Sequence, residues 1–255
     1  VHLSGQSSEM LKIKELSNQY NFKIIEDASH ALGGSYKKEK IGSCKFSDLT
    51  VFSLHPVKMI TTGEGGLITT NNKSIAKKIK FFRSHGITKD ISEMEKDPDG
   101  LWYYEQLELG YNYRMPDINA ALGISQLEKL DKFVSKREEI AKYYDKNLKN
   151  LPLKTPQQIP NCISSRHLYI IKIDNKLSKL NHKDIFSKLR DFNIGVNLHY
   201  IPIHLQPYYK NLGFAKGQFP EAERYYEEAI SLPIFTKLTK NEQNYVIETI
   251  RKLIK

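Results

Sequence analysis

The sequence of 255 residues is poor in cysteine and has no long apolar run. Its two cysteines, Cys44 and Cys162, are too few for a disulfide framework, and neither belongs to a paired zinc-binding motif. No apolar stretch approaches the roughly 18 residues that a membrane span requires. We also expect no signal peptide, and the sequence does not begin with methionine. We therefore expect a cytoplasmic protein with no membrane partner and no metal site.

Basic residues outnumber acidic ones, with 39 Lys+Arg against 29 Asp+Glu and a formal net charge of +10. The lysines are spread along the chain in short runs, such as 37–40 and 77–80, which are typical of solvated surfaces. No basic stripe with interleaved aromatic residues marks a nucleic-acid-binding module. A positive field would also suit a small ligand that carries phosphate. The composition thus predicts no nucleic-acid partner, and charge alone does not identify the ligand.

The first half of the chain alternates helical and extended patterns. Helical periodicity is expected over 10–20 and 74–84, with Gly86 as the stop signal of the second helix. Residues 88–116 have no sustained periodicity, and we interpret them as a long functional loop. Short extended runs that predict strands occupy residues 22–25, 49–54 and 67–70.

The second half begins with a long helical pattern that predicts a helix from Asp117, as its N-cap, to about Leu148. Residues 151–160 contain prolines and read as a linker. A smaller α/β pattern follows, with strands expected at 168–173 and 195–199 and helices at 182–192, 220–229 and 240–254. Thr239 and Glu242 form a capping box before the last helix. We place the two domains at 1–133 and 134–255.

Two of the predicted strands end in polar clusters, Glu-Asp-Ala-Ser-His at 26–30 and Ser-Leu-His-Pro-Val-Lys at 53–58. In open α/β sheets, ligands bind beyond the carboxyl ends of the strands. Pyridoxal 5'-phosphate needs a lysine for attachment, a carboxylate at its pyridine nitrogen, and hydroxyl groups and amides for its phosphate. Lys58, Asp27 and Ser53 match these needs by type and position. A strand-end cap and a solvated lysine remain the alternative interpretation.

Five longer motifs occur in order: EDASHALGGSY, FSLHPVKMITTGEGG, RSHG, LGYNYRMPDINAALGISQL and HYIPIHLQPYY. Together they resemble the DegT-type sugar aminotransferases, which are fold-type I pyridoxal phosphate enzymes. The resemblance covers essentially the whole chain and implies an α/β, aspartate-aminotransferase-like fold. It also implies that 1–133 is the C-terminal part of the large α/β/α cofactor-binding domain and 134–255 the small C-terminal α/β domain. Family members are usually longer, and the part not represented here is N-terminal.

The resemblance implies a role for each matching residue. Lys58 stands where the family has its Schiff-base lysine, which also moves the proton during transfer. Asp27 matches the partner of the pyridinium nitrogen, and His30 a position that contacts the cofactor. Ser53 matches the phosphate-binding serine. Asn112 matches an asparagine that reaches the phosphate from the other subunit, which implies an obligate homodimer with a shared active site.

Substrate residues are less clearly marked. His55, beside the lysine, and His199, after a predicted strand of the second domain, are candidate contacts to the sugar, and each could equally be structural. Arg114 and Arg83 could bind a phosphate or carboxylate, or hold the dimer together. The aromatic residues 102–104 could stack on a uracil or form a small local core.

Within the family, HPVKMITTGEGG and DGLWYYEQLELGYNYR most resemble the branch of pseudaminic acid biosynthesis. This implies transfer of an amino group from glutamate to C4 of a UDP-4-keto-6-deoxy-N-acetylhexosamine. One alternative is an aminotransferase for another nucleotide-linked 4-keto sugar, and another is an inactive, N-terminally truncated fragment. A dehydrating branch of the family replaces the lysine by histidine, and Lys58 speaks against that branch.

Overall fold

The computed structural model describes residues 1–254, which divide into two compact units. Unit 1 comprises residues 1–2 and 7–130, and unit 2 comprises residues 3–6 and those from 131 onward. No helix in the described part of the chain is long and apolar enough to cross a membrane. Nor do His, Cys, Asp and Glu side chains gather there in any group of three or more that could hold a metal ion.

The centre of unit 1 is a three-stranded sheet with the strand order β1-β4-β5. Strand β1 (Ile25–Asp27) runs parallel to β4 (Leu49–Ser53), and β5 (Gly66–Thr69) runs antiparallel to β4. The register pairs Asp27 with Val51. Consequently, the carboxyl ends of β1 and β4 lie at the same edge of the sheet. The predicted strand at 22–25 is wrong by about three residues, because the polar pair 26–27 continues the extended ladder.

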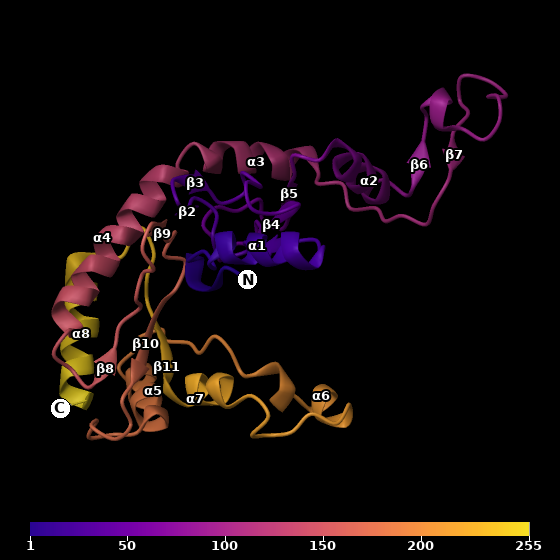
Figure 1. Ribbon diagram of the computed structural model, residues 1–255. Coiled ribbons are helices and arrows are strands. Elements are labelled where there is room, and N and C mark those ends of the chain that lie inside the picture. The colour runs from indigo at the N-terminus through magenta and orange to yellow at the C-terminus, as the bar shows by residue number, and fades with distance from the viewer. Residues whose placement is uncertain (255) are drawn as a thin grey trace. The chain divides into compact units, whose positions relative to one another are not determined.

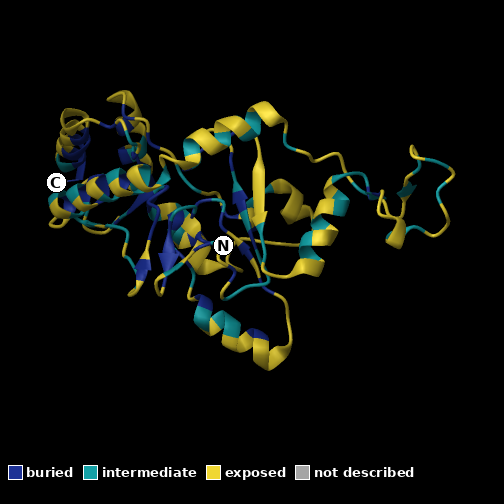
Figure 2. Ribbon diagram, turned by 90° about the horizontal axis from the view of Figure 1, so that it is seen from above, coloured by how far each residue is buried: buried dark blue, intermediate teal, exposed yellow. Residues whose placement is uncertain are grey.

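Three α-helices belong to unit 1: α1 (Met10–Tyr20), α2 (Lys73–Arg83) and α3 (Asp117–Leu127). Asn72 caps α2, since its side chain accepts hydrogen bonds from the backbone N–H groups of residues 74 and 75. Helix α3 is rich in apolar residues, yet none of them is buried (Figure 2).

Two short hairpins complete unit 1. Strands β2 (Ser35–Tyr36) and β3 (Glu39–Lys40) are joined through Lys37 and Lys38, which both adopt positive φ. Strands β6 (Ile87–Thr88) and β7 (Glu105–Gln106) pair in an arm that extends beyond α2 and also contains the short helix η2 (Ile91–Glu93) (Figure 1). The expected long loop at 88–116 therefore contains a hairpin, whose two-residue strands are too short to show periodicity.

Unit 2 is built around an antiparallel sheet with the order β11-β10-β8. Its strands are β8 (Leu153–Lys154), β10 (Tyr169–Ile173) and β11 (Ala229–Leu232). Apolar side chains of this sheet pack with those of three helices, α4 (Leu130–Leu148), α5 (His182–Asp191) and α8 (Lys240–Ile254), in one large core. The remaining elements are η1 (Leu3–Gly5), β9 (Cys162–Ile163), η3 (Ile203–Leu205), α6 (Pro207–Asn211) and α7 (Pro220–Glu228).

Polar anchors fix the core of unit 2. The buried guanidinium of Arg137 donates hydrogen bonds to the carbonyl oxygens of Arg166 and His167, each at 3.2 Å, and of Ile234 at 2.9 Å. Burial lowers the pKa of Arg137 to about 10. The capping box is confirmed: Thr239 N donates to Glu242 Oε2 at 2.8 Å, and Glu242 N donates to Thr239 Oγ1 at 3.2 Å.

Two predictions for the second half are wrong. The long helix is interrupted after Leu127, where Lys129 N bonds to Gln126 O and leaves the α-helical ladder, and its N-cap is Pro116, with Asp117 in the first turn. Residues 195–199 do not form a strand. Asn197 pairs with β11 only in an isolated bridge, because its side chain accepts a hydrogen bond from the next backbone N–H and competes with the ladder.

Both cysteines are buried, and neither belongs to a disulfide. Cys44 lies in unit 1, where its Sγ is 3.2 Å from the carbonyl oxygen of Thr69. Cys162 lies in β9 of unit 2.

Candidate active site

Asp27 ends β1 and has a carboxylate fixed in direction by its own turn. Its Oδ1 accepts hydrogen bonds from the backbone N of Ser29 at 3.0 Å and from Ser29 Oγ at 2.6 Å. Partial burial raises the pKa of Asp27, while the two bonds from Ser29 and nearby positive charge lower it, and the net pKa lies below its ordinary value. The side chain is thus an oriented anion at neutral pH.

Lys58 lies in the loop that follows β4, in a turn closed by a 2.9 Å bond from its backbone N to His55 O. Burial lowers the pKa of Lys58 below its ordinary value, and the negative charge of Asp27 opposes that shift. The two side chains are therefore close enough to interact electrostatically. A lysine with a lowered pKa more readily supplies the neutral amine that a nucleophile or base needs.

The loop between β4 and β5 is tied to the sheet by its own hydrogen bonds. Leu54 N donates to Gly65 O at 2.9 Å, and Leu54 O accepts from Thr62 N and Thr61 Oγ1, both at 3.0 Å. The side chain of Asn119, in α3, donates to the carbonyl oxygen of Thr62. These contacts hold the backbone on both sides of Lys58 without a regular secondary structure.

Ser53 and His30 lie at the same sheet edge. Ser53 is the last residue of β4, is half-buried, and faces Gly66 across the ladder. His30 is buried in the turn after β1, where Ala31 N bonds to Ala28 O at 2.8 Å, and its proximity helps to lower the pKa of Asp27. The structure thus brings together four of the predicted residues, Asp27, His30, Ser53 and Lys58.

Asn112 and Arg114 are not part of this group. Both are exposed on the segment that returns from the arm and runs along the end of α2, where Asn112 forms a bridge with Ser84. Among the described residues, no hydrogen bond or ion pair joins either of them to Asp27 or Lys58. Arg83, at the end of α2, is likewise exposed.

The aromatic residues of the arm have different environments. Trp102 and Tyr104 are exposed, Trp102 by 76%. Tyr103 is held locally, because its hydroxyl donates to Glu105 Oε1 at 3.0 Å and its ring lies 5.1 Å from Lys96 Nζ. A local structural role thus fits Tyr103, while the other two rings are available for contact.

The two candidate sugar-binding histidines lie in different units. His55 is exposed in the loop of Lys58, with its Nε2 3.7 Å from Glu64 Oε1. His199 belongs to unit 2, where its Nδ1 lies 2.8 Å from Ser231 Oγ and its carbonyl oxygen accepts a hydrogen bond from Tyr225. Burial raises the pKa of Tyr225 to about 12, so its hydroxyl remains a donor at neutral pH.

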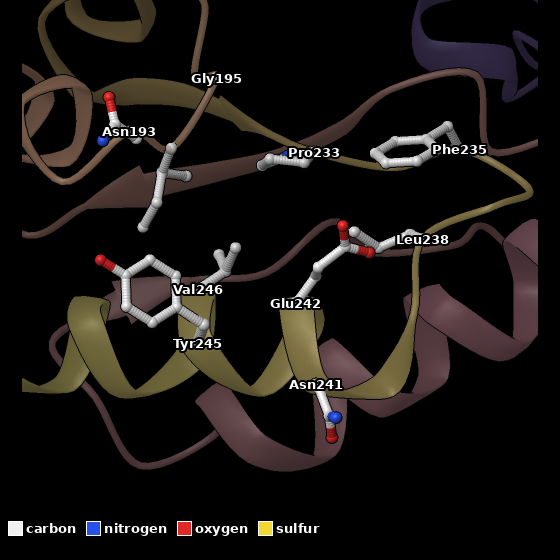
Figure 3. Close-up of a pocket in the computed structure, with 10 residues that line it drawn as sticks. Asn193, Gly195, Pro233, Phe235, Leu238, Asn241, Glu242, Tyr245 and Val246 are labelled. Carbon is white, nitrogen blue, oxygen red and sulfur yellow. The ribbon is translucent and has the colours of Figure 1, made fainter.

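A pocket of about 460 Å³ lies in unit 2, beside the first turns of α8 (Figure 3). Its lining is mainly apolar and includes Phe235 and Tyr245, and its one carboxylate, Glu242, is engaged in the capping box. None of the predicted site residues lines it. The pocket therefore lacks the chemistry that the end of the unit 1 sheet provides.

The sequence analysis missed three residues that support the site. Ser29 could have been found from its spacing, because a serine two residues after an aspartate commonly bonds the carboxylate in a turn. His2 and Glu26 form a buried pair with an Nε2–Oε2 distance of 2.6 Å. Twenty-four residues separate them, so no local pattern indicates the pair.

Comparison with known proteins identifies the same aminotransferase family that the sequence motifs resemble, over nearly the whole chain. A profile described as the DegT/DnrJ/EryC1/StrS aminotransferase family matches residues 1–251. An uncharacterized protein of Methanocaldococcus jannaschii is 43% identical over all of this chain and 66% of its own length. The UDP-4-amino-4,6-dideoxy-N-acetyl-beta-L-altrosamine transaminase of Campylobacter jejuni is 40% identical over all of this chain and 64% of its own length.

Solved structures agree. PseC of Helicobacter pylori, an aminotransferase involved in the biosynthesis of pseudoaminic acid, has a TM-score of 0.89 and 32% identity over 99% of this chain and 65% of its own. The PLP-form of a putative sugar aminotransferase from Streptococcus pneumoniae has a TM-score of 0.85 and 30% identity, covering 99% and 66% of the respective chains. The chain thus has the fold-type I aminotransferase architecture and spans slightly less than two thirds of the length of these proteins.

Proposed function

This chain belongs to the DegT/DnrJ/EryC1/StrS aminotransferase family, and we propose that the protein is a sugar aminotransferase that uses pyridoxal 5'-phosphate. The family depends on this cofactor. One observation of the structure carries the proposal: Asp27 ends β1, Lys58 follows the parallel neighbour β4, and the charge of Asp27 acts on the amine of Lys58.

The residues at the sheet edge fit the cofactor by their chemistry. Lys58 would hold it covalently, and the ionised carboxylate of Asp27 would pair with its ring nitrogen. Ser53 would bind the phosphate, and His30 would contact the ring. When bound, pyridoxal phosphate supplies an electron sink for charge that develops at the α-carbon of an amino acid. We assign this site to residues 1–133, as the cofactor-binding domain, and 134–255 to the small domain.

Each residue contributes a separate physical effect in this assignment. Asp27 is kept ionised by Ser29, and a fixed anion favours the protonated form of a ring nitrogen beside it. Burial lowers the pKa of Lys58, so its amine releases a proton more readily than an ordinary lysine does. The hydrogen bonds that tie the loop on both sides of Lys58 would restrict the reach of its amine, and this would set the stereochemistry of proton return.

For substrates we propose glutamate as the amino donor and a UDP-4-keto-6-deoxy-N-acetylhexosamine as the acceptor, as in pseudaminic acid synthesis. The transaminase activity for which the Campylobacter relative is named and the structural likeness to PseC support this choice. His55, Arg114 and His199 are the proposed sugar contacts. Asn112 is exposed and separate from the other cofactor residues, and we propose that it acts in the partner's site of a cytoplasmic homodimer.

The test is an absorbance titration with pyridoxal phosphate, followed by borohydride reduction and peptide mapping. A new visible band and a pyridoxyl label on Lys58 are expected. A label on other lysines only would refute the role of Lys58. Loss of the band on adding glutamate, and its return with one of a panel of UDP- and dTDP-linked 4-keto sugars, would identify the acceptor. Return with a dTDP sugar alone would replace our proposed substrate by the alternative one.

A further inference from the structure

A buried hydrogen-bond network lies on the side of β1 opposite to Asp27. Side chains alternate along a strand, and β1 shows this alternation, with Glu26 buried between two exposed residues. Glu26 Oε2 lies 2.6 Å from His2 Nε2, while Oε1 accepts from Thr50 Oγ1 at 3.1 Å and from the hydroxyl of Ser47. His2 is 1% exposed and Glu26 is 7% exposed. A carboxylate is thus buried with three donors, one residue before Asp27.

The contacts of His2 determine where its proton lies. The backbone N of Ser8 donates to His2 Nδ1 at 3.1 Å, so that nitrogen must carry a lone pair. The proton is then on Nε2, which donates it to Glu26, and the imidazole is neutral. The negative charge of the network accordingly resides on Glu26. Burial raises the pKa of this carboxyl and the bonds from His2, Ser47 and Thr50 lower it, and the net pKa lies below its ordinary value.

His2 also contacts the strand end through its backbone. Its N–H donates to the carbonyl oxygen of Asp27 at 2.9 Å, and the next N–H, of Ala28, donates to Val51 O at 2.8 Å. The peptide group after Asp27 is therefore held on one side by His2 and on the other by β4. Because Thr50 is the register partner of Glu26, the network fixes the alignment of β1 against β4 as well.

We propose that His2 and Glu26 are positioning residues, which hold the end of β1 so that the Asp27 carboxylate keeps the place and direction that cofactor binding requires. The claim that cofactor binding requires this placement rests on the function proposed above for Asp27, and it is the second half of the inference. The first half, that His2 and Glu26 hold the end of β1, concerns only the backbone at 27–29 and is independent of any bound group.

The experiment compares three variants of the chain. His2→Leu removes both side-chain hydrogen bonds of His2, while His2→Gln keeps a donor for Glu26 and an acceptor for Ser8. Thr88→Val is the matched control, since Thr88 is also buried in unit 1 and its hydroxyl bonds to Glu93 at 2.8 Å, away from β1. Amide hydrogen exchange is followed by mass spectrometry and NMR. The Asp27 carboxyl is titrated by carbon-13 NMR and assigned with Asp27→Asn.

In His2→Leu we expect exchange at the amides of Ala28 and Ser29 to accelerate at least tenfold more than at the amides of β5. The pKa of Asp27 should also rise toward its ordinary value. His2→Gln should restore both, and Thr88→Val should change neither. A uniform acceleration throughout unit 1, or none at Ala28 and Ser29, would overturn the positioning role.

Cofactor affinity separates this inference from the proposed function. A pyridoxal phosphate titration should give a dissociation constant at least tenfold weaker for His2→Leu than for His2→Gln. If the amides and the pKa respond as expected but cofactor binding is equal in the two variants, the network still positions Asp27. In that case the assigned role of Asp27 toward the cofactor is what fails, and with it the second half of the inference.

Discussion

The backbones of Gly86 and Gly110 are in close contact at the base of the β6–β7 arm, where neither residue has room for a side chain. A Cβ atom on Gly110 would overlap the backbone nitrogen of Gly86, and one on Gly86 would overlap the carbonyl oxygen of Glu108. Gly86 also has a φ of +67°, which non-glycine residues rarely adopt. The arm thus leaves and rejoins unit 1 through a crossing that needs both glycines, two residues before Asn112.

Gly110→Ala should displace the arm, because the added methyl group meets backbone atoms that cannot rotate away. We expect a loss of about 1–3 kcal/mol in the free energy of unfolding, as for overpacked sites. Gly195→Ala is the control, since nothing lies within 4 Å of the position of its Cβ. Urea unfolding of both variants measures the effect. An equal loss in the two would contradict the claim that the close contact of Gly86 with Gly110 leaves no room for a methyl group.

Lys58→Ala should lower the aminotransfer rate at least about 1000-fold, because it removes the nucleophile and the proton carrier together. Lys78→Ala is the control, as Lys78 is exposed on α2. The assay is chromatographic detection of the amino sugar product. Appreciable turnover by Lys58→Ala would show that Lys58 is neither the nucleophile nor the proton carrier.

Asp27→Asn keeps the size of the side chain but removes its charge. We expect turnover to fall by at least about 100-fold while the free energy of unfolding changes by less than about 1 kcal/mol. Asp191→Asn, at the exposed end of α5, should alter neither quantity. If a folded Asp27→Asn protein turns over normally, the carboxylate does not support the cofactor ring.

Much of the fold was accessible from the sequence, because long periodic segments and turn residues act locally. The capping box at Thr239 was found from two side chains three residues apart. Interactions between distant segments were not accessible, and the network of His2 with Glu26 is the clearest case. The strand expected at 195–199 failed for a related reason, since a side-chain bond at Asn197 outweighs its extended pattern. At the site, residue types and the order of the strands predicted the grouping of Asp27 with Lys58.

Acid should weaken the protein partly through Glu26. The pKa of Glu26 in the folded chain lies below its ordinary value of 4.5, so the unfolded chain binds the proton more readily. Its stabilising contribution is therefore complete above about pH 4.5 and is lost as the pH falls through the folded pKa. Glu26→Gln has no such contribution to lose. The gap in unfolding free energy between wild type and Glu26→Gln should narrow from pH 7 to pH 3 in urea titrations, and a constant gap would count against this account.

Ile171→Ala should destabilise unit 2 by about 2–5 kcal/mol, because it leaves a cavity in a fully buried position of β10. Leu177→Ala removes a side chain that is 73% exposed and should cost less than about 0.5 kcal/mol. Thermal unfolding followed by circular dichroism compares the two. Similar midpoints would mean that the core around β10 is looser than the structure shows.

Each unit contains one buried thiol, whose rate of chemical labelling reports how often that unit opens. Cys44 is 8% exposed in unit 1 and Cys162 is 7% exposed in unit 2, so a thiol reagent reaches either one only when its surroundings open. A pulse of labelling, read by mass spectrometry, would time the two openings separately in one sample. The labelling rates of Cys44 and Cys162 would also show whether a bound ligand slows the opening of one unit or of both.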